Sequence, residues 1–115
     1  MAFSDLRKFL SVLESTGELV HFREELSPKY EIPAAIKYIS QHIKKTVVFD
    51  RAKGYDIPVV GNLLGSRKLL AIAFGVTEDN IVETYLARAK NPIKPRVVDN
   101  APVQEVVTES NIDIL

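Results

Sequence analysis

The chain has 115 residues, of which 46% are hydrophobic, a size that fits one domain with a single core. Its 15 Lys and Arg residues balance 15 Asp and Glu residues, and the two signs alternate along the chain, which disfavours a nucleic-acid binder. The absence of cysteine excludes disulfides, thiolate nucleophiles and cysteine metal sites, and no apolar run is long enough for a signal peptide or a membrane span. We therefore expect a soluble, cytoplasmic protein.

The first element expected is an amphipathic helix near the N-terminus. Apolar residues recur at helical spacing from Leu6 to Leu13, and Gly17 ends the pattern. Ser4 is a suitable N-cap for this helix. Residues 18–23 then alternate in polarity, which predicts a half-buried strand.

A second helix and a second strand are expected next. An apolar stripe runs from Ile32 to Ile43 at helical spacing, and Pro33 is tolerated because it falls in the first turn. The β-branched run at 46–49 predicts a short buried strand.

A third strand and a third helix are expected on either side of a glycine-containing turn. Residues 57–60 are apolar, but Pro58 cannot donate to a sheet ladder, so this strand should lie at an edge or begin at the proline. Gly61 should end the strand. Ser66 is the expected cap of the following helix, and Gly75 closes it.

A fourth helix is expected after Thr77, which we interpret as its N-cap. Its apolar residues are expected to face the interior, and they are Ile81, Val82, Tyr85, Leu86 and Ala89.

The remainder of the chain is expected to be an extended tail. Prolines interrupt it, and residues 96–98 and 103–107 are candidate strands. The whole pattern predicts an α+β (mixed α/β) fold, in which about four helices cover a small sheet. We place the domain body at 1–92 and a strand-rich tail at 93–115. The order of the strands in the sheet is left open.

The turn at 61–68 is the strongest candidate for a site. A glycine turn that leads into a helix leaves backbone N–H groups free to hold an anion, and Arg67 and Lys68 would add positive charge. Its spacing fits neither a P-loop nor a dinucleotide fingerprint. We therefore favour a structural turn, in which Gly61 and Gly65 adopt positive φ. The candidate residues for a cleft wall or an anion contact are Asn62, Ser66 and Arg67.

The sequence contains no evident catalytic group. His21 and His42 lie on different expected elements, and neither has a carboxylate or a second histidine at metal-ligand spacing. There is no Ser-His-Asp order and no nucleophile elbow. We expect no catalytic, cofactor-binding or metal-binding residue in this chain.

Several motifs, in a shared order, resemble the N-terminal region of the UbiD-like decarboxylases. The most specific is GNLLGS at 61–66, which follows KGYDIPV at 53–59. The other segments are LRKFL at 6–10, GELV at 17–20, EIPAAI at 31–36, VFD at 48–50, APVQE at 101–105 and NIDIL at 111–115. The resemblance extends over nearly the whole chain.

The resemblance implies part of a carboxy-lyase that uses prenylated FMN to remove or add a carboxyl group on aromatic or α,β-unsaturated acids. In complete family members the acid–base residues, the flavin pocket and the ligands of a divalent metal (Mn²⁺) and of K⁺ lie in later domains, which have no counterpart here. The resemblance therefore implies a noncatalytic N-terminal domain or small subunit, inactive alone. Its partner would be a UbiD-like catalytic chain, or the remainder of the same polypeptide, in a larger oligomer.

Two other hypotheses remain open. The valines of residues 103–107 would let a stand-alone interaction or regulatory module add a strand to a partner, with no role in decarboxylation. Alternatively, Ser66, Arg67 and Lys68 would bind a phosphate compound. The substrate, the direction of the reaction and the oligomer size are not determined by these residues.

Overall fold

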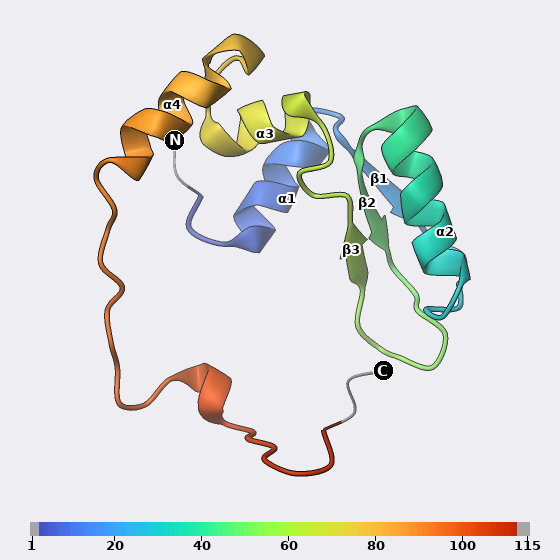
Figure 1. Cartoon of the computed structure of the whole chain (residues 1–115). Helices are drawn as coiled ribbons and strands as arrows, with labels where there is room; N and C mark the ends of the chain where they lie inside the picture. Colours follow the sequence, from blue (N-terminus) through green and yellow to red (C-terminus); the bar gives the residue numbers. More distant parts are fainter. Residues whose placement is uncertain (1–2, 113–115) are drawn as a thin grey trace.

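Four α-helices and one three-stranded sheet form the folded part of residues 3–112, the range that the computed structural model describes (Figure 1). The elements in chain order are α1 (Leu6–Ser15), β1 (Leu19–Phe22), α2 (Glu31–Tyr38) with a wider helical turn at Ile39–Ile43, β2 (Thr46–Phe49), β3 (Val59–Gly61), α3 (Arg67–Phe74), a short turn at Glu78–Asn80, and α4 (Ile81–Ala89). The α+β fold class is confirmed.

The sheet has the order β1-β2-β3, which the sequence left open. β1 pairs with β2 in parallel, with Val20 opposite Val47, and β2 pairs with β3 in antiparallel, with Val48 opposite Val60. All four residues of the central strand β2 are buried. Pro58 lies just before the edge strand β3, as expected for a residue that cannot donate to the ladder.

The core lies on both faces of this sheet. On one face, α2 packs Ile32 and Ile39 against Val47 and Phe49. On the other, α1 and α3 bring together a second buried cluster, formed by Phe9, Leu13 and Leu69. Figure 1 shows α2 on one side of the strands and α1 with α3 on the other. This three-layer arrangement places the start of α3 near the residues that lead into β2.

The helix boundaries follow the cap residues. α1 begins after Asp5, whose carboxylate accepts a hydrogen bond of 2.8 Å from the Lys8 N–H. The prediction of Ser4 as the cap is wrong by one position, because the Ser4 hydroxyl instead donates to the Asp5 carboxylate. The predicted cap of α3, Ser66, is confirmed by the hydrogen bond that its oxygen accepts from the first helical turn. Gly75 ends α3 at φ 69°.

α4 contradicts the prediction made for its apolar residues. Of the five expected to face inward, only Ile81 is buried. The reason is that α4 sits at one end of the body and packs mainly against α3 and the turn at Glu78–Asn80, which leaves its other side exposed in the described structure. Thr77 precedes the short turn that leads into α4, but its side chain makes no capping hydrogen bond.

The tail contains no strand among its described residues 93–112, so the predicted strands at 96–98 and 103–107 are wrong. Its one regular piece is a single 3₁₀ turn at Pro102–Gln104. A strand needs a neighbour to pair its N–H and C=O groups, and the described tail loops round at a distance from the sheet without pairing with it (Figure 1). The tail also widens the molecule, whose radius of gyration is 17.2 Å.

The last three residues of the closing NIDIL motif, 113–115, lie outside the described residues.

Among the helices of residues 3–112, none combines the length and apolarity that crossing a lipid bilayer requires.

Candidate functional site

The turn between β3 and α3 owes its shape to Asn62. This residue has φ 55°, in the left-handed region that asparagine tolerates better than most residues. Its side-chain amide donates a hydrogen bond of 2.8 Å to the Lys45 carbonyl, which ties the turn to the start of β2. Gly61 and Gly65 are not at positive φ, so the prediction that they supply this conformation is wrong.

Gly61 and Gly65 instead allow neighbouring side chains to lie close to the backbone. A Cβ on Gly61 would lie 2.6 Å from the end of the Ile36 side chain. A Cβ on Gly65 would overlap the Asn62 side chain itself. Both positions are therefore restricted by packing around the turn, because real Cβ atoms do not approach other atoms so closely.

Ser66 and Arg67 line an open hollow beside the start of α3. The hollow has a volume of about 540 Å³. The Ser66 oxygen is used by the helix cap, and the Arg67 guanidinium donates 2.9 Å to the Glu78 carbonyl. Asn62 does not line this hollow. The structure therefore brings two of the three candidate residues, Ser66 and Arg67, to one surface, and Asn62 is not part of it.

Positive charge predominates around this hollow. Its charged lining residues are Lys44, Lys45, Arg67, Lys68, Glu18 and Glu78. Glu18 and Lys68 form an ion pair of 2.6 Å, in which the Glu18 side chain is only 10% exposed. The other lysines leave the hollow able to attract an anion or an acidic segment of a partner.

The sequence did not predict that Glu18, Lys44 and Lys45 meet Ser66. Glu18 precedes β1, Lys45 precedes β2 and Ser66 follows β3. The pairing of β2 with both β1 and β3 is what brings them together, and no local motif encodes that pairing.

A second polar cluster surrounds His21. Its Nδ1 lies 3.0 Å from Asp50 Oδ1, and its Nε2 lies 3.5 Å from Glu14 Oε1. The histidine therefore connects α1 to the end of β2, although sequence spacing gave it no partner. His42 lies beside the Tyr38 ring, with centroids 4.5 Å apart. Within residues 3–112, no three His, Asp or Glu side chains gather in a way that could hold a metal ion.

These features define a class of protein. The described chain is a small α+β domain with a hydrogen-bonded turn, a hollow lined mainly by positive charge, and a fourth helix that is apolar on its outer side.

Comparison with known proteins gives the family. Residues 10–89 match the family model of the 3-octaprenyl-4-hydroxybenzoate carboxy-lyase N-terminal domain. The chain therefore belongs to the UbiD family, through its N-terminal domain.

Similar proteins are much longer than this chain. It is 35% identical to a phenolic acid decarboxylase of Sedimentibacter hydroxybenzoicus, over 97% of this chain and 25% of the relative. It is similar to the UbiD-class enzyme HmfF of Pelotomaculum thermopropionicum in complex with FMN, with a TM-score of 0.75, 38% identity, and coverage of 94% of this chain and 24% of that one. The closed form of the vanillic acid decarboxylase of S. hydroxybenzoicus gives a TM-score of 0.74 at 32% identity, over 99% of this chain and 26% of that one. This chain thus spans about a quarter of their length.

Proposed function

We propose that this chain is the noncatalytic N-terminal domain, or a separate small subunit, of a UbiD-like decarboxylase or carboxylase acting on aromatic or α,β-unsaturated carboxylic acids. The observation that carries the proposal is the match of 94% of this chain to about a quarter of an FMN-bound enzyme of this class. The remaining length of such an enzyme has room for a cofactor pocket and acid–base residues. The cytoplasm is the proposed location, because the chain lacks cysteine.

The cofactors of the proposed enzyme belong to its partner body. Prenylated FMN would supply the electron sink for carboxyl transfer, assisted by Mn²⁺ and K⁺. The described residues do not fit a metal, since they offer no cluster of ligands. We therefore assign no step of the reaction to this chain, and we expect it to be inactive by itself.

This chain would support the flavin-bearing body and enclose part of the cleft beside the flavin. The turn from Asn62 to Arg67 is held by the Lys45 and Glu78 carbonyls. A turn fixed in this way is suited to form one wall of the cleft beside the flavin. Asn62 and Ser66 would act through the backbone that they hold, and Arg67 through its position at the hollow.

The proposal is tested on the native assembly. A tag on this chain, at its native expression level, should recover a complex that shows flavin absorbance and releases CO₂ from a phenolic acid such as vanillic acid. The isolated chain, incubated with prenylated FMN and the same acid, should bind no flavin and release no CO₂. Flavin binding or turnover by the isolated chain contradicts the proposal.

Intact mass of the same assembly separates the alternatives. One long polypeptide indicates a domain of a single enzyme, and two masses indicate a small subunit with a catalytic partner. Recovery of this chain with no flavin-bearing polypeptide would favour the stand-alone interaction module instead.

A further inference from the structure

The outer side of α4 carries three large apolar side chains that no other described residue covers. Val82, Tyr85 and Leu86 are 58%, 58% and 55% exposed. Their spacing places them on one side of the helix, and we call them the α4 stripe. Single exposed apolar residues are ordinary, whereas a contiguous apolar patch marks a surface for interaction.

α4 is already attached to the body through a different face. Ile81 is buried, and the Arg88 guanidinium lies 5.5 Å from the centre of the Phe74 ring. Arg88 also donates 3.0 Å to the Phe74 carbonyl. A helix with one packed side has one apolar face, and apolar residues on a further face are typical of a helix packed on both sides. The described chain supplies only one of these two neighbours.

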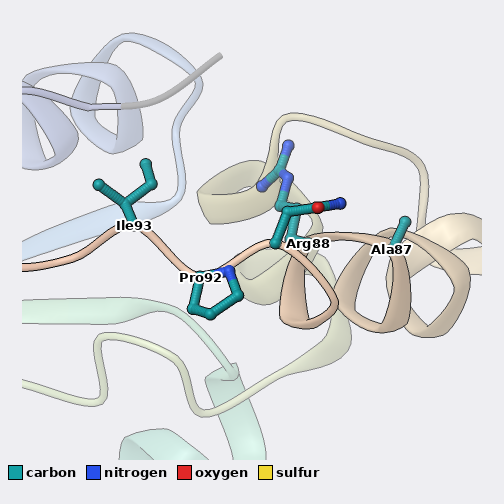
Figure 2. A pocket seen from close by; sticks show the side chains of 5 residues that line it. Ala87, Arg88, Pro92 and Ile93 are labelled. Atoms are coloured by element: carbon teal, nitrogen blue, oxygen red, sulfur yellow. The ribbon is translucent and has the colours of Figure 1, made fainter.

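Two open hollows extend the α4 stripe toward the tail. The first, of about 550 Å³, is lined by Val82, Leu86 and Ala87 among others. The second, of about 540 Å³, lies where the chain leaves α4 and is lined by Ala87, Pro92 and Ile93 (Figure 2). Because the two share Ala87, one surface runs from the helix to Ile93, which is 96% exposed, and charged residues such as Glu83 and Lys90 border its apolar part.

The exposed area of the α4 stripe favours a large partner over a second copy of this chain. Three half-exposed side chains of this size present on the order of 300 Å², whereas a stable interface buries about 800 Å² on each partner. A second copy docked stripe to stripe therefore falls short. A larger body can cover the α4 stripe, Ile93 and the exposed valines of the tail together, and so bury more of this chain than the stripe alone offers. The matched enzymes have such a body, since three quarters of their length lies outside the region that this chain matches.

We propose that the α4 stripe and Ile93 form the docking surface for the flavin-bearing body of the enzyme. The inference rests on the proposed function and adds the surface through which it operates. Tyr85 lines neither hollow and so lies at an edge of this surface, where its ring supplies apolar contact area while its hydroxyl reaches a polar partner at the rim.

The test uses the absence of cysteine from this chain. Tyr85→Cys creates a single thiol on the α4 stripe, Leu86→Cys provides a second position there, and Tyr30→Cys, at a side chain that is 71% exposed before α2, is the matched control. Each variant is purified as the native assembly and treated with a maleimide. The labelling of its cysteine peptide is followed by mass spectrometry and compared with the same sample in urea.

The expected result is at least tenfold slower labelling at positions 85 and 86 in the assembly than in urea, with much weaker protection at position 30. A photo-crosslinker attached to position 85 should join the flavin-bearing part of the enzyme. Labelling of both stripe positions at the rate seen in urea, or crosslinking to a second copy of this chain, overturns the inference. An assembly without flavin overturns the proposed function, whereas flavin with unprotected stripe cysteines overturns only the docking surface.

Discussion

Asn62 shows how one residue sets the geometry of the candidate site. The αL conformation costs most L-residues about 1–2 kcal/mol, and the side-chain hydrogen bond to the Lys45 carbonyl recovers part of that cost. Gly65 must then lack a side chain, because the Asn62 amide occupies the space that a Cβ would take. Within the GNLLGS motif, the position of the Asn62 side chain therefore requires a glycine at position 65.

Two substitutions separate the backbone effect from the hydrogen bond. Asn62→Ala loses both, and we expect the free energy of unfolding to fall by about 2 kcal/mol. Asn62→Gly loses the hydrogen bond but keeps an easy positive φ, so we expect a smaller fall, of about 1 kcal/mol. Urea unfolding followed by circular dichroism measures both values. If the alanine variant is as stable as the glycine variant, the φ of Asn62 does not carry the cost assigned to it.

The sequence predicted where this turn lies, but not which of its residues has positive φ or which charges surround it. Two glycines beside a helix cap indicated a tight turn, and Ser66 was identified correctly as that cap. The residue at positive φ was missed, because asparagine is less strongly associated with that region than glycine. The charges of Arg67 and Lys68 were expected, whereas those of Glu18, Lys44 and Lys45 were missed because these residues lie far away in the chain, just before β1 and β2.

At the scale of elements, α1 depends on a charged cap. The pKa of the Asp5 carboxyl is lowered, first by the hydrogen bond from the Lys8 N–H and then by the one from the Ser4 hydroxyl. A carboxyl with a lowered folded-state pKa stabilises the fold above its unfolded pKa. That stability is lost as the pH falls through the folded-state value, which for an aspartate lies below about pH 4.

Asp5→Asn tests this cap, because asparagine keeps an oxygen acceptor and does not titrate. We expect wild type to melt at a higher temperature than the variant at pH 6, and the difference to shrink as the pH is lowered to 3. Thermal melts of α-helical circular dichroism at the two pH values provide the measurement. A difference that stays constant over this range would show that the charge of Asp5 adds nothing to its role as a cap.

Elements were predicted well where their apolar residues meet the core and poorly where they do not. β2 and α3 are confirmed because buried β-branched and capped helical patterns leave few alternatives. α4 was found, but its outward residues were assigned to the interior, since periodicity cannot tell a side that faces this chain from one that faces another body. The strands of the tail failed for a related reason, because β-propensity does not supply a pairing partner.

The whole molecule combines a packed body with a tail that adds little to it. A packed domain of this length has an expected radius of gyration of about 13 Å, and the observed 17.2 Å reflects the outlying tail. Ile93, Val97 and Val103 are exposed, and the tail makes no ladder with β1, β2 or β3 in the described structure. The stability of the body should therefore be nearly independent of the tail.

Removing residues 93–115 tests this independence and the predicted boundary at residue 92. We expect the free energy of unfolding to change by less than about 0.5 kcal/mol, because none of the described residues 93–112 is buried, and the radius of gyration from X-ray scattering to fall toward about 13 Å. A second truncation after residue 80 is the control, since it also removes Ile81 and the Arg88 contact to Phe74. It should lower the free energy of unfolding by about 2 kcal/mol or more. A loss of that size from the first truncation would mean that the tail belongs to the folding unit, and the boundary would have to move toward the C-terminus.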